Sequence, residues 1–221
     1  AGAGDVAVAY DFANGDEGWT AGVADYSPNQ SDSIDFTSGI EALPDEVAET
    51  SGETGFLLSG KNVSDDLAMF LTRRLGPADG IQANQGYEVS YRLVFASDAP
   101  SNCVGVGGAP GESVYLKAGA AGIEPMAVEQ DGDIRMNVDK GNQSTGGTNA
   151  SVVGNIANGI PCEDAIDQGY PYVSLTREHT HTEVIEANDQ GELWLMVLTD
   201  SGFESTTALF YQEIEATLTP R

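Results

Sequence analysis

Short apolar runs separated by polar turn residues dominate the chain, and several runs alternate between apolar and polar positions. In residues 87–96 the odd-numbered positions from Tyr87 to Phe95 are apolar or aromatic, and most of the even-numbered positions are polar. Because successive side chains of a strand point to opposite faces, this pattern predicts a strand with one buried face. Residues 193–198 form an unbroken apolar run, which predicts a central strand buried on both faces.

Weaker versions of the same pattern recur along the chain. Residues 67–75 fit either a helix or a strand, and we favour a strand. The alternation in residues 208–218 changes register near Gln212, which predicts a β-bulge at that position. Further strands are predicted at residues 6–12, 55–58, 113–118, 134–138 and 172–176.

Two long polar regions, residues 25–54 and 139–171, show few strand signals and are predicted to be loops. No internal repeat or change in composition marks a boundary between domains. The sequence therefore predicts a single domain over residues 1–221. Its expected fold class is all-β: a two-sheet antiparallel jelly-roll β-sandwich with long loops.

The formal net charge of −26 restricts the partners of this chain, and its first basic residue is Lys61. Such a surface repels phosphate backbones and anionic lipids, which excludes nucleic-acid binding. Two interpretations of the acidity remain. Either the carboxylates form a solvated coat, or some of them converge on a divalent cation such as Ca²⁺, which binds oxygen ligands.

The two cysteines, Cys103 and Cys162, lie in loop-like segments and do not form a C-x-x-C pair. We expect them to form one disulfide, and the alternative is two free thiols in a cytosolic protein. A disulfide predicts an extracellular, periplasmic or cell-surface location. No transmembrane run is present, and the start of the sequence is typical of a mature terminus, with lipid anchoring left open.

Three stretches, residues 10–19, 80–91 and 208–214, resemble the first strand, a central strand and the last strand of a known fold group. They are similar to jelly-roll β-sandwiches of the galactose-binding and carbohydrate-binding-module type. The chain also resembles an uncharacterised group of bacterial exported or lipoprotein-type proteins. The resemblance touches both ends of the chain and one central strand.

This resemblance implies two kinds of site. A structural Ca²⁺ would lie between the first and last strands, where the matching acids are Asp11, Asp16 and Glu213. Gln212 stands where that group usually has another acid. A glycan site would use exposed aromatic side chains, and the candidates are Trp19, Tyr26, Tyr170 and Tyr172.

The pair His179 and His181 supplies a second hypothesis. On a strand, side chains at i and i+2 share one face, so the two imidazoles and Glu183 could form a two-histidine, one-carboxylate metal site. This arrangement is similar to the metal strand of cupins, although no third histidine exists. The alternative is a pair of solvent-facing histidines.

Residues 131–143 are rich in Asp, Asn and Gly. Asp139 and Asn142 could supply oxygen atoms to a hard cation or a sugar. The alternative is a hairpin turn at Asp131-Gly132 followed by a solvated loop.

No catalytic constellation stands out, so we favour a non-catalytic protein over an enzyme. The leading hypothesis is an exported binding module that recognises an extracellular glycan and is braced by Ca²⁺. The alternatives are a metal-dependent cupin-like enzyme or metal-binding protein using His179 and His181, and a structural or adhesive cell-envelope protein. The sequence does not determine the oligomeric state.

Overall fold

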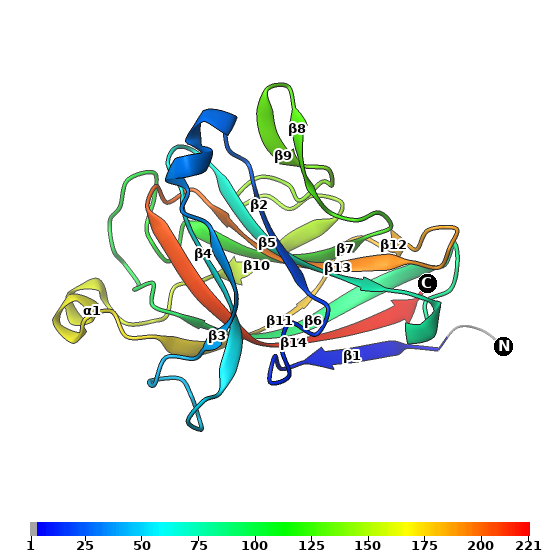
Figure 1. Cartoon of the computed structure of the whole chain (residues 1–221), viewed down its shortest axis with the longest axis horizontal. Coiled ribbons are helices and arrows are strands. Elements are labelled where there is room, and N and C mark those ends of the chain that lie inside the picture. Colours follow the sequence, from blue (N-terminus) through cyan, green and yellow to red (C-terminus); the bar gives the residue numbers. More distant parts are fainter. Residues whose placement is uncertain (1–3) are drawn as a thin grey trace.

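A computed structural model describes residues 4–221, and two antiparallel sheets form its body (Figure 1). The first sheet has seven strands in the order β11-β6-β14-β4-β3, with β1 added beside β14 and β12 beside β6. The second has five strands in the order β10-β7-β13-β5-β2, and β8 and β9 form a separate hairpin. The all-β sandwich predicted from the sequence is therefore confirmed.

The strands of the seven-stranded sheet are β1 (Val6–Tyr10), β3 (Thr37–Ala42), β4 (Thr54–Lys61), β6 (Gly86–Ser97), β11 (Val173–Thr180), β12 (Ile185–Glu186) and β14 (Thr206–Pro220). Those of the five-stranded sheet are β2 (Thr20–Ala24), β5 (Leu67–Leu75), β7 (Val114–Ala121), β10 (Ala150–Asn155) and β13 (Leu193–Ser201). The hairpin consists of β8 (Ala127–Gln130) and β9 (Asp133–Met136), and the helical elements are η1 (Pro28–Ser33), η2 (Pro77–Asp79) and α1 (Cys162–Gln168).

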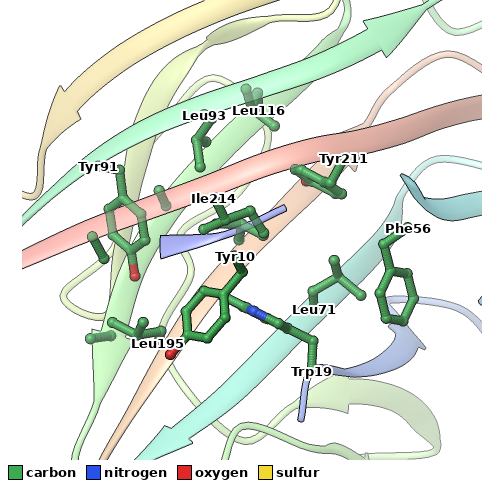
Figure 2. Packing of buried hydrophobic residues seen from close by; sticks show 14 of the residues in the cluster. Tyr10, Trp19, Phe56, Leu71, Tyr91, Leu93, Leu116, Leu195, Tyr211 and Ile214 are labelled. Atoms are coloured by element: carbon green, nitrogen blue, oxygen red, sulfur yellow. The ribbon is translucent and has the colours of Figure 1, made fainter. Parts of the chain in front are cut away.

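The main hydrophobic core lies between the two sheets. The odd-numbered residues of β6 from Tyr87 to Phe95 are all buried there, as the alternation predicts. Figure 2 shows how Tyr91 and Leu93 from one sheet meet Leu116 and Leu195 from the other. Burial of this apolar surface supplies the main driving force for the fold.

Strand β13 is buried on both faces, which confirms the prediction from its unbroken apolar run. Leu195 and Val197 face the main core, whereas Met196 and Leu198 belong to a second, smaller cluster. That cluster includes Met136 at the end of β9. Residues around the β8–β9 hairpin therefore cover the outer face of the five-stranded sheet, and β13 needs apolar side chains in both directions.

The bulge predicted near Gln212 is present in β14. The pairing of β14 with β6 shifts register between Tyr211 and Glu213. Tyr211 and Ile214 both remain buried, because the extra residue between them reverses the alternation. As a result Glu213 points out of the sheet and pairs with Arg92.

The prediction that residues 25–54 and 139–171 are loops throughout is wrong. The first region contains η1 and β3, and the second contains β10 and α1. Strands β3 and β10 lie at sheet edges and are only partly buried, so their residues lack the apolar alternation of a core strand. Helix α1 has seven residues, too few for a helical repeat to show in the sequence.

The predicted disulfide between Cys103 and Cys162 is confirmed, with a Cα–Cα distance of 5.1 Å. It ties the loop that follows β6 to the first residue of α1. A backbone hydrogen bond of 2.8 Å from Ser101 N to Ile160 O holds the same two segments together. Among residues 4–221, no helix has the length and apolar character needed to cross a membrane.

Candidate functional site

A cavity of about 500 Å³ opens at the end of the sandwich that carries α1. We call it the end cavity. Its walls come from the loop after β6, from α1 and the residues after it, and from the segment that joins β13 to β14. It is lined by Asp98, Ala99, Pro100, Cys103, Val104, Pro110, Ile156, Cys162, Ile166, Tyr170, Phe203, Ser205, Thr206, Thr207 and Ala208.

The disulfide and the end of α1 position one wall of this cavity. Helix α1 ends at Gly169, whose φ of 76° favours glycine. The next residue, Tyr170, donates its backbone N–H to Ala165 O at 2.9 Å, which folds the chain back over the short helix. Cys162 anchors the other end of α1 to Cys103, so the helix and Tyr170 are held against the β6 loop.

The rim of the end cavity is apolar and exposed. Val104 is 99% exposed, Ile166 is 58% exposed and Tyr170 is 46% exposed. Apolar side chains grouped at a concave surface mark binding sites more often than singly scattered ones do. The rim therefore offers one aromatic ring and two aliphatic groups to a ligand.

Two residues that line the end cavity, Asp98 and Thr207, carry polar side-chain groups of different accessibility. The Asp98 carboxyl directly follows β6, and its burial raises its pKa to about 6. The Thr207 hydroxyl is buried and has no hydrogen-bond partner among the described residues. Because this hydroxyl oxygen is closed to solvent, the Asp98 carboxyl is the acidic group that the cavity presents to a ligand.

Asp98 is the only acidic residue among the described residues that line the end cavity. Hydrolysis of a glycosidic bond usually requires two carboxyl groups on opposite sides of the bond. The described lining of the end cavity supplies one carboxyl group of this kind, that of Asp98.

The aromatic residues suggested as glycan-binding candidates lie in different environments in the structure. Tyr170 lines the end cavity, but Trp19 is only 1% exposed and packs edge-on against Tyr10 in the core (Figure 2). Trp19 is therefore not available to stack on a sugar. Tyr172 is half-buried and packs edge-on against Phe210, and burial raises its pKa to about 12. Tyr26 lines a different cavity.

The two histidines do converge, but on a serine. Ser151 Oγ lies 2.7 Å from His179 Nε2 and 2.9 Å from His181 Nδ1. His181 Nε2 lies 3.0 Å from Thr148 O, so this nitrogen must donate and Nδ1 must accept in the neutral ring. A consistent chain then runs from His179 Nε2–H to Ser151 Oγ–H to His181 Nδ1.

Both imidazoles are held neutral in this arrangement. Burial lowers the pKa of His179 and of His181, and the neighbouring His181 lowers that of His179 further. Three of the four ring nitrogens are engaged in hydrogen bonds, which disfavours the metal-site hypothesis. Glu183 lines the same cavity as His179, but β11 ends at Thr180, so Glu183 does not lie on the strand that the pattern assumed.

The structure separates Asp139 from Asn142. Asp139 accepts hydrogen bonds from Gly141 N at 3.0 Å and from Thr148 N at 2.9 Å, and these bonds lower its pKa. Its carboxylate therefore shapes the loop itself. Asn142 lines a different cavity, together with Asp25 and Asp66.

The residues that the resemblance suggests for Ca²⁺ are not assembled into one donor set. Asp11 and Glu213 line one cavity on the outside of the seven-stranded sheet, but Asp16 does not. Asp11 accepts from Ala13 N, Asp16 accepts from Gly18 N, and Glu213 pairs with Arg92. The structure therefore does not bring these three carboxylates together at one cavity.

In overall fold the chain is similar to carbohydrate-binding modules of the β-sandwich type. One is a structure from work on the structural basis of promiscuous specificity in carbohydrate-binding modules of the β-sandwich superfamily. It has 10% identity and a TM-score of 0.40, and the match covers 92% of this chain and 58% of that one. A second is the tandem CBM22 domain of Paenibacillus barcinonensis Xyn10C, with 15% identity, a TM-score of 0.40 and coverage of 100% and 47%.

A third is CBM27-1 of Caldicellulosiruptor saccharolyticus in complex with mannohexaose, with 6% identity, a TM-score of 0.42 and coverage of 95% of both chains. No protein-family model matches the sequence. No curated protein sequence matches it either.

Proposed function

We propose that this protein is a non-catalytic module, exported from the cytosol, that binds a neutral glycan in the end cavity. One observation carries the proposal. The exposed Tyr170 ring borders a cavity that the Asp98 carboxyl also lines.

These groups match the surface of a sugar ring. A pyranose presents a face of C–H groups, which packs against an aromatic or aliphatic surface, and a rim of hydroxyl groups, which need hydrogen-bond partners. Tyr170 and Ile166 offer the apolar surface, and the Asp98 carboxyl offers a hydrogen-bond partner to the hydroxyl groups. The cavity volume of about 500 Å³ lies in the range of small-ligand sites and admits a few sugar residues at the end of a chain.

The charge of the protein selects among glycans. A net charge of −26 repels uronic acids and sulfated sugars, which favours neutral chains. The disulfide supports a location outside the cytosol, because such bonds persist in oxidising compartments.

Calorimetric titration with three chemically distinct neutral probes, xylohexaose, mannohexaose and β-1,4-galactotriose, tests the proposal. We expect one of them to bind the wild-type protein, and Tyr170→Ala and Asp98→Asn to weaken that binding by at least about tenfold, equivalent to about 1.4 kcal/mol. Tyr26→Ala removes a half-buried tyrosine outside the cavity and serves as the matched control. Unchanged affinity in Tyr170→Ala, or no binding of any probe, would contradict the proposal.

A further inference from the structure

Three aspartates from separate parts of the chain meet at one end of the five-stranded sheet. Asp25 follows β2, Asp66 precedes β5, and Asp200 lies near the end of β13. These strands are neighbours and antiparallel, and both Ala24 and Asp200 are in register with Ala68. One carboxylate oxygen of each aspartate lies within 4.8 Å of those of the other two.

Two buried lysines neutralise part of this cluster. Lys117 Nζ donates to two backbone carbonyls and to Asp200 Oδ2 at 2.7 Å. Lys140 Nζ donates to one backbone carbonyl, to Asp200 Oδ2 at 2.7 Å and to Asp25 Oδ2 at 2.6 Å. An ammonium group has three protons, so neither lysine has a donor left for another oxygen.

The remaining oxygens of Asp66 and Asp200 lack a donor. Asp200 is fully buried, and its Oδ1 has no hydrogen-bond partner among the described residues; the same is true of Asp66 Oδ1. One carboxylate oxygen of Asp66 lies within 4.8 Å of one of Asp200. Two carboxylate oxygens this close require a positive charge between them, either a shared proton or a cation.

A cation accounts for more of the geometry than a proton does. A proton bridges two oxygens, whereas the cluster offers oxygens from three carboxylates within the span of one coordination sphere. A cavity of about 350 Å³ is lined by Asp25 and Asp66, so it borders two of the three aspartates. Other oxygen-bearing side chains on its wall are those of Ser27, Gln30, Ser64, Asp65, Asp133 and Asn142.

The local charge also favours a divalent ion. Asp25, Asp65, Asp66 and Asp133 line this cavity together with Arg135, and Asp200, Lys117 and Lys140 lie behind it. Five carboxylates thus face three cations, which leaves an excess of two negative charges. We propose that Asp25, Asp66 and Asp200 bind one Ca²⁺ ion, whose preference for several oxygen ligands fits this wall.

This ion would join strands that are separate in sequence. It would link the ends of β2, β5 and β13, and through the Gln143 N–H, which donates to Asp200 Oδ2 at 2.8 Å, it would also steady the loop before β10. The site is distinct from the end cavity, so its test does not depend on glycan binding.

Calorimetric titration of Ca²⁺ into chelator-treated protein tests the proposal, together with the melting temperature with and without Ca²⁺. We expect one ion per chain and a higher melting temperature in Ca²⁺. Asp66→Asn should abolish both effects and still fold, because its amide can donate to Asp200 Oδ1. Asp32→Asn removes the same charge at an exposed position in η1 and should behave as wild type.

A local probe keeps the test independent of the stability of any one variant. Tb³⁺ replaces Ca²⁺ and emits light when a nearby aromatic ring is excited, and Tyr26 lines the cavity. We expect sensitised emission that Ca²⁺ displaces and that Tyr26→Phe weakens. Absence of Ca²⁺ binding in the wild type would overturn the proposal and leave a shared proton between Asp66 and Asp200. An equal response of the wild type and Asp66→Asn would also overturn it, because it would show screening of surface charge only.

Discussion

The Oη atom of Tyr91 donates a hydrogen bond of 2.6 Å to the backbone carbonyl of Gly119, across the interior between the two sheets. Tyr91 belongs to β6 and Gly119 to β7, so one bond joins the central parts of both layers. It satisfies a hydroxyl that the aromatic pattern of β6 buries in an otherwise apolar core.

We predict that Tyr91→Phe lowers the free energy of unfolding by about 0.5–1.5 kcal/mol, since it removes a buried hydrogen bond between the two sheets. Chemical denaturation measures this loss. Tyr115→Phe, at a half-buried position on β7, is the control and should change little. Equal stability of Tyr91→Phe and the wild type would mean that the bond contributes nothing net.

Gly119 also allows the close approach of the neighbouring edge strand. A Cβ atom at this position would lie 2.0 Å from Asn149 O and 2.7 Å from Ala150 Cα, both of which are backbone atoms. We predict that Gly119→Ala destabilises the protein by roughly 3 kcal/mol, because β10 must move away from β7. Gly154→Ala, whose nearest heavy atom would be 3.5 Å away, should be close to neutral in the same denaturation experiment.

The disulfide between Cys103 and Cys162 closes a segment of 59 residues. In the chain-entropy model, this link stabilises the folded state by about 4 kcal/mol, because it restricts the unfolded chain. We predict a loss of this size in the double variant Cys103→Ala, Cys162→Ala. The unfolding midpoint of the wild type should also fall under reducing conditions, while that of the double variant should not respond.

Much of the sandwich could be predicted because its core strands carry their burial pattern in the sequence. The alternation in β6 and the register change at Gln212 each follow from a side-chain period of two. The edge strands β3 and β10 could not be found this way. Their residues are half-exposed, and their pairing is set by partners far along the chain.

The candidate sites were harder to predict, because they depend on which loops meet. The pattern around Tyr170 identified an aromatic residue, but nothing local connected it with Asp98 or Thr207, which reach the end cavity from other strands. Trp19 shows the opposite error. The resemblance suggested it as an exposed aromatic residue, yet its ring is buried in the core.

The contact of Ser151 with both histidines leads to a further prediction. Ser151→Ala should leave His181 Nδ1 buried without a donor and cost about 1–3 kcal/mol. Ser144→Ala, at an exposed position on the same cavity, should have no comparable effect.

The two histidines should also make stability depend on pH. Because the pKa values of both histidines are lowered in the fold, their contribution to stability is present above pH 6.5 and is lost as the pH falls below it. Stability measured against pH should show this decline.

Asp98 should produce the opposite dependence on pH. Burial raises its pKa from 3.8 to about 6, so the folded protein favours the neutral acid relative to the unfolded chain. Its favourable contribution is fully present below about pH 4 and is lost as the pH rises through about 6, a change of up to about 3 kcal/mol. Asp98→Asn cannot ionise, so we predict that it is more stable than the wild type by about 1–3 kcal/mol at neutral pH and equal to it near pH 4.

The Asp98→Asn variant should change stability and glycan binding in opposite directions. Asp98→Asn should unfold at higher denaturant concentration at neutral pH and yet bind the glycan probe more weakly, since the amide replaces a charged acceptor in the end cavity. Groups kept at a site at the expense of stability are typical of ligand-binding sites. If Asp98→Asn lost stability at neutral pH, the carboxylate would have a structural partner in the fold, and its assignment to ligand binding would be wrong.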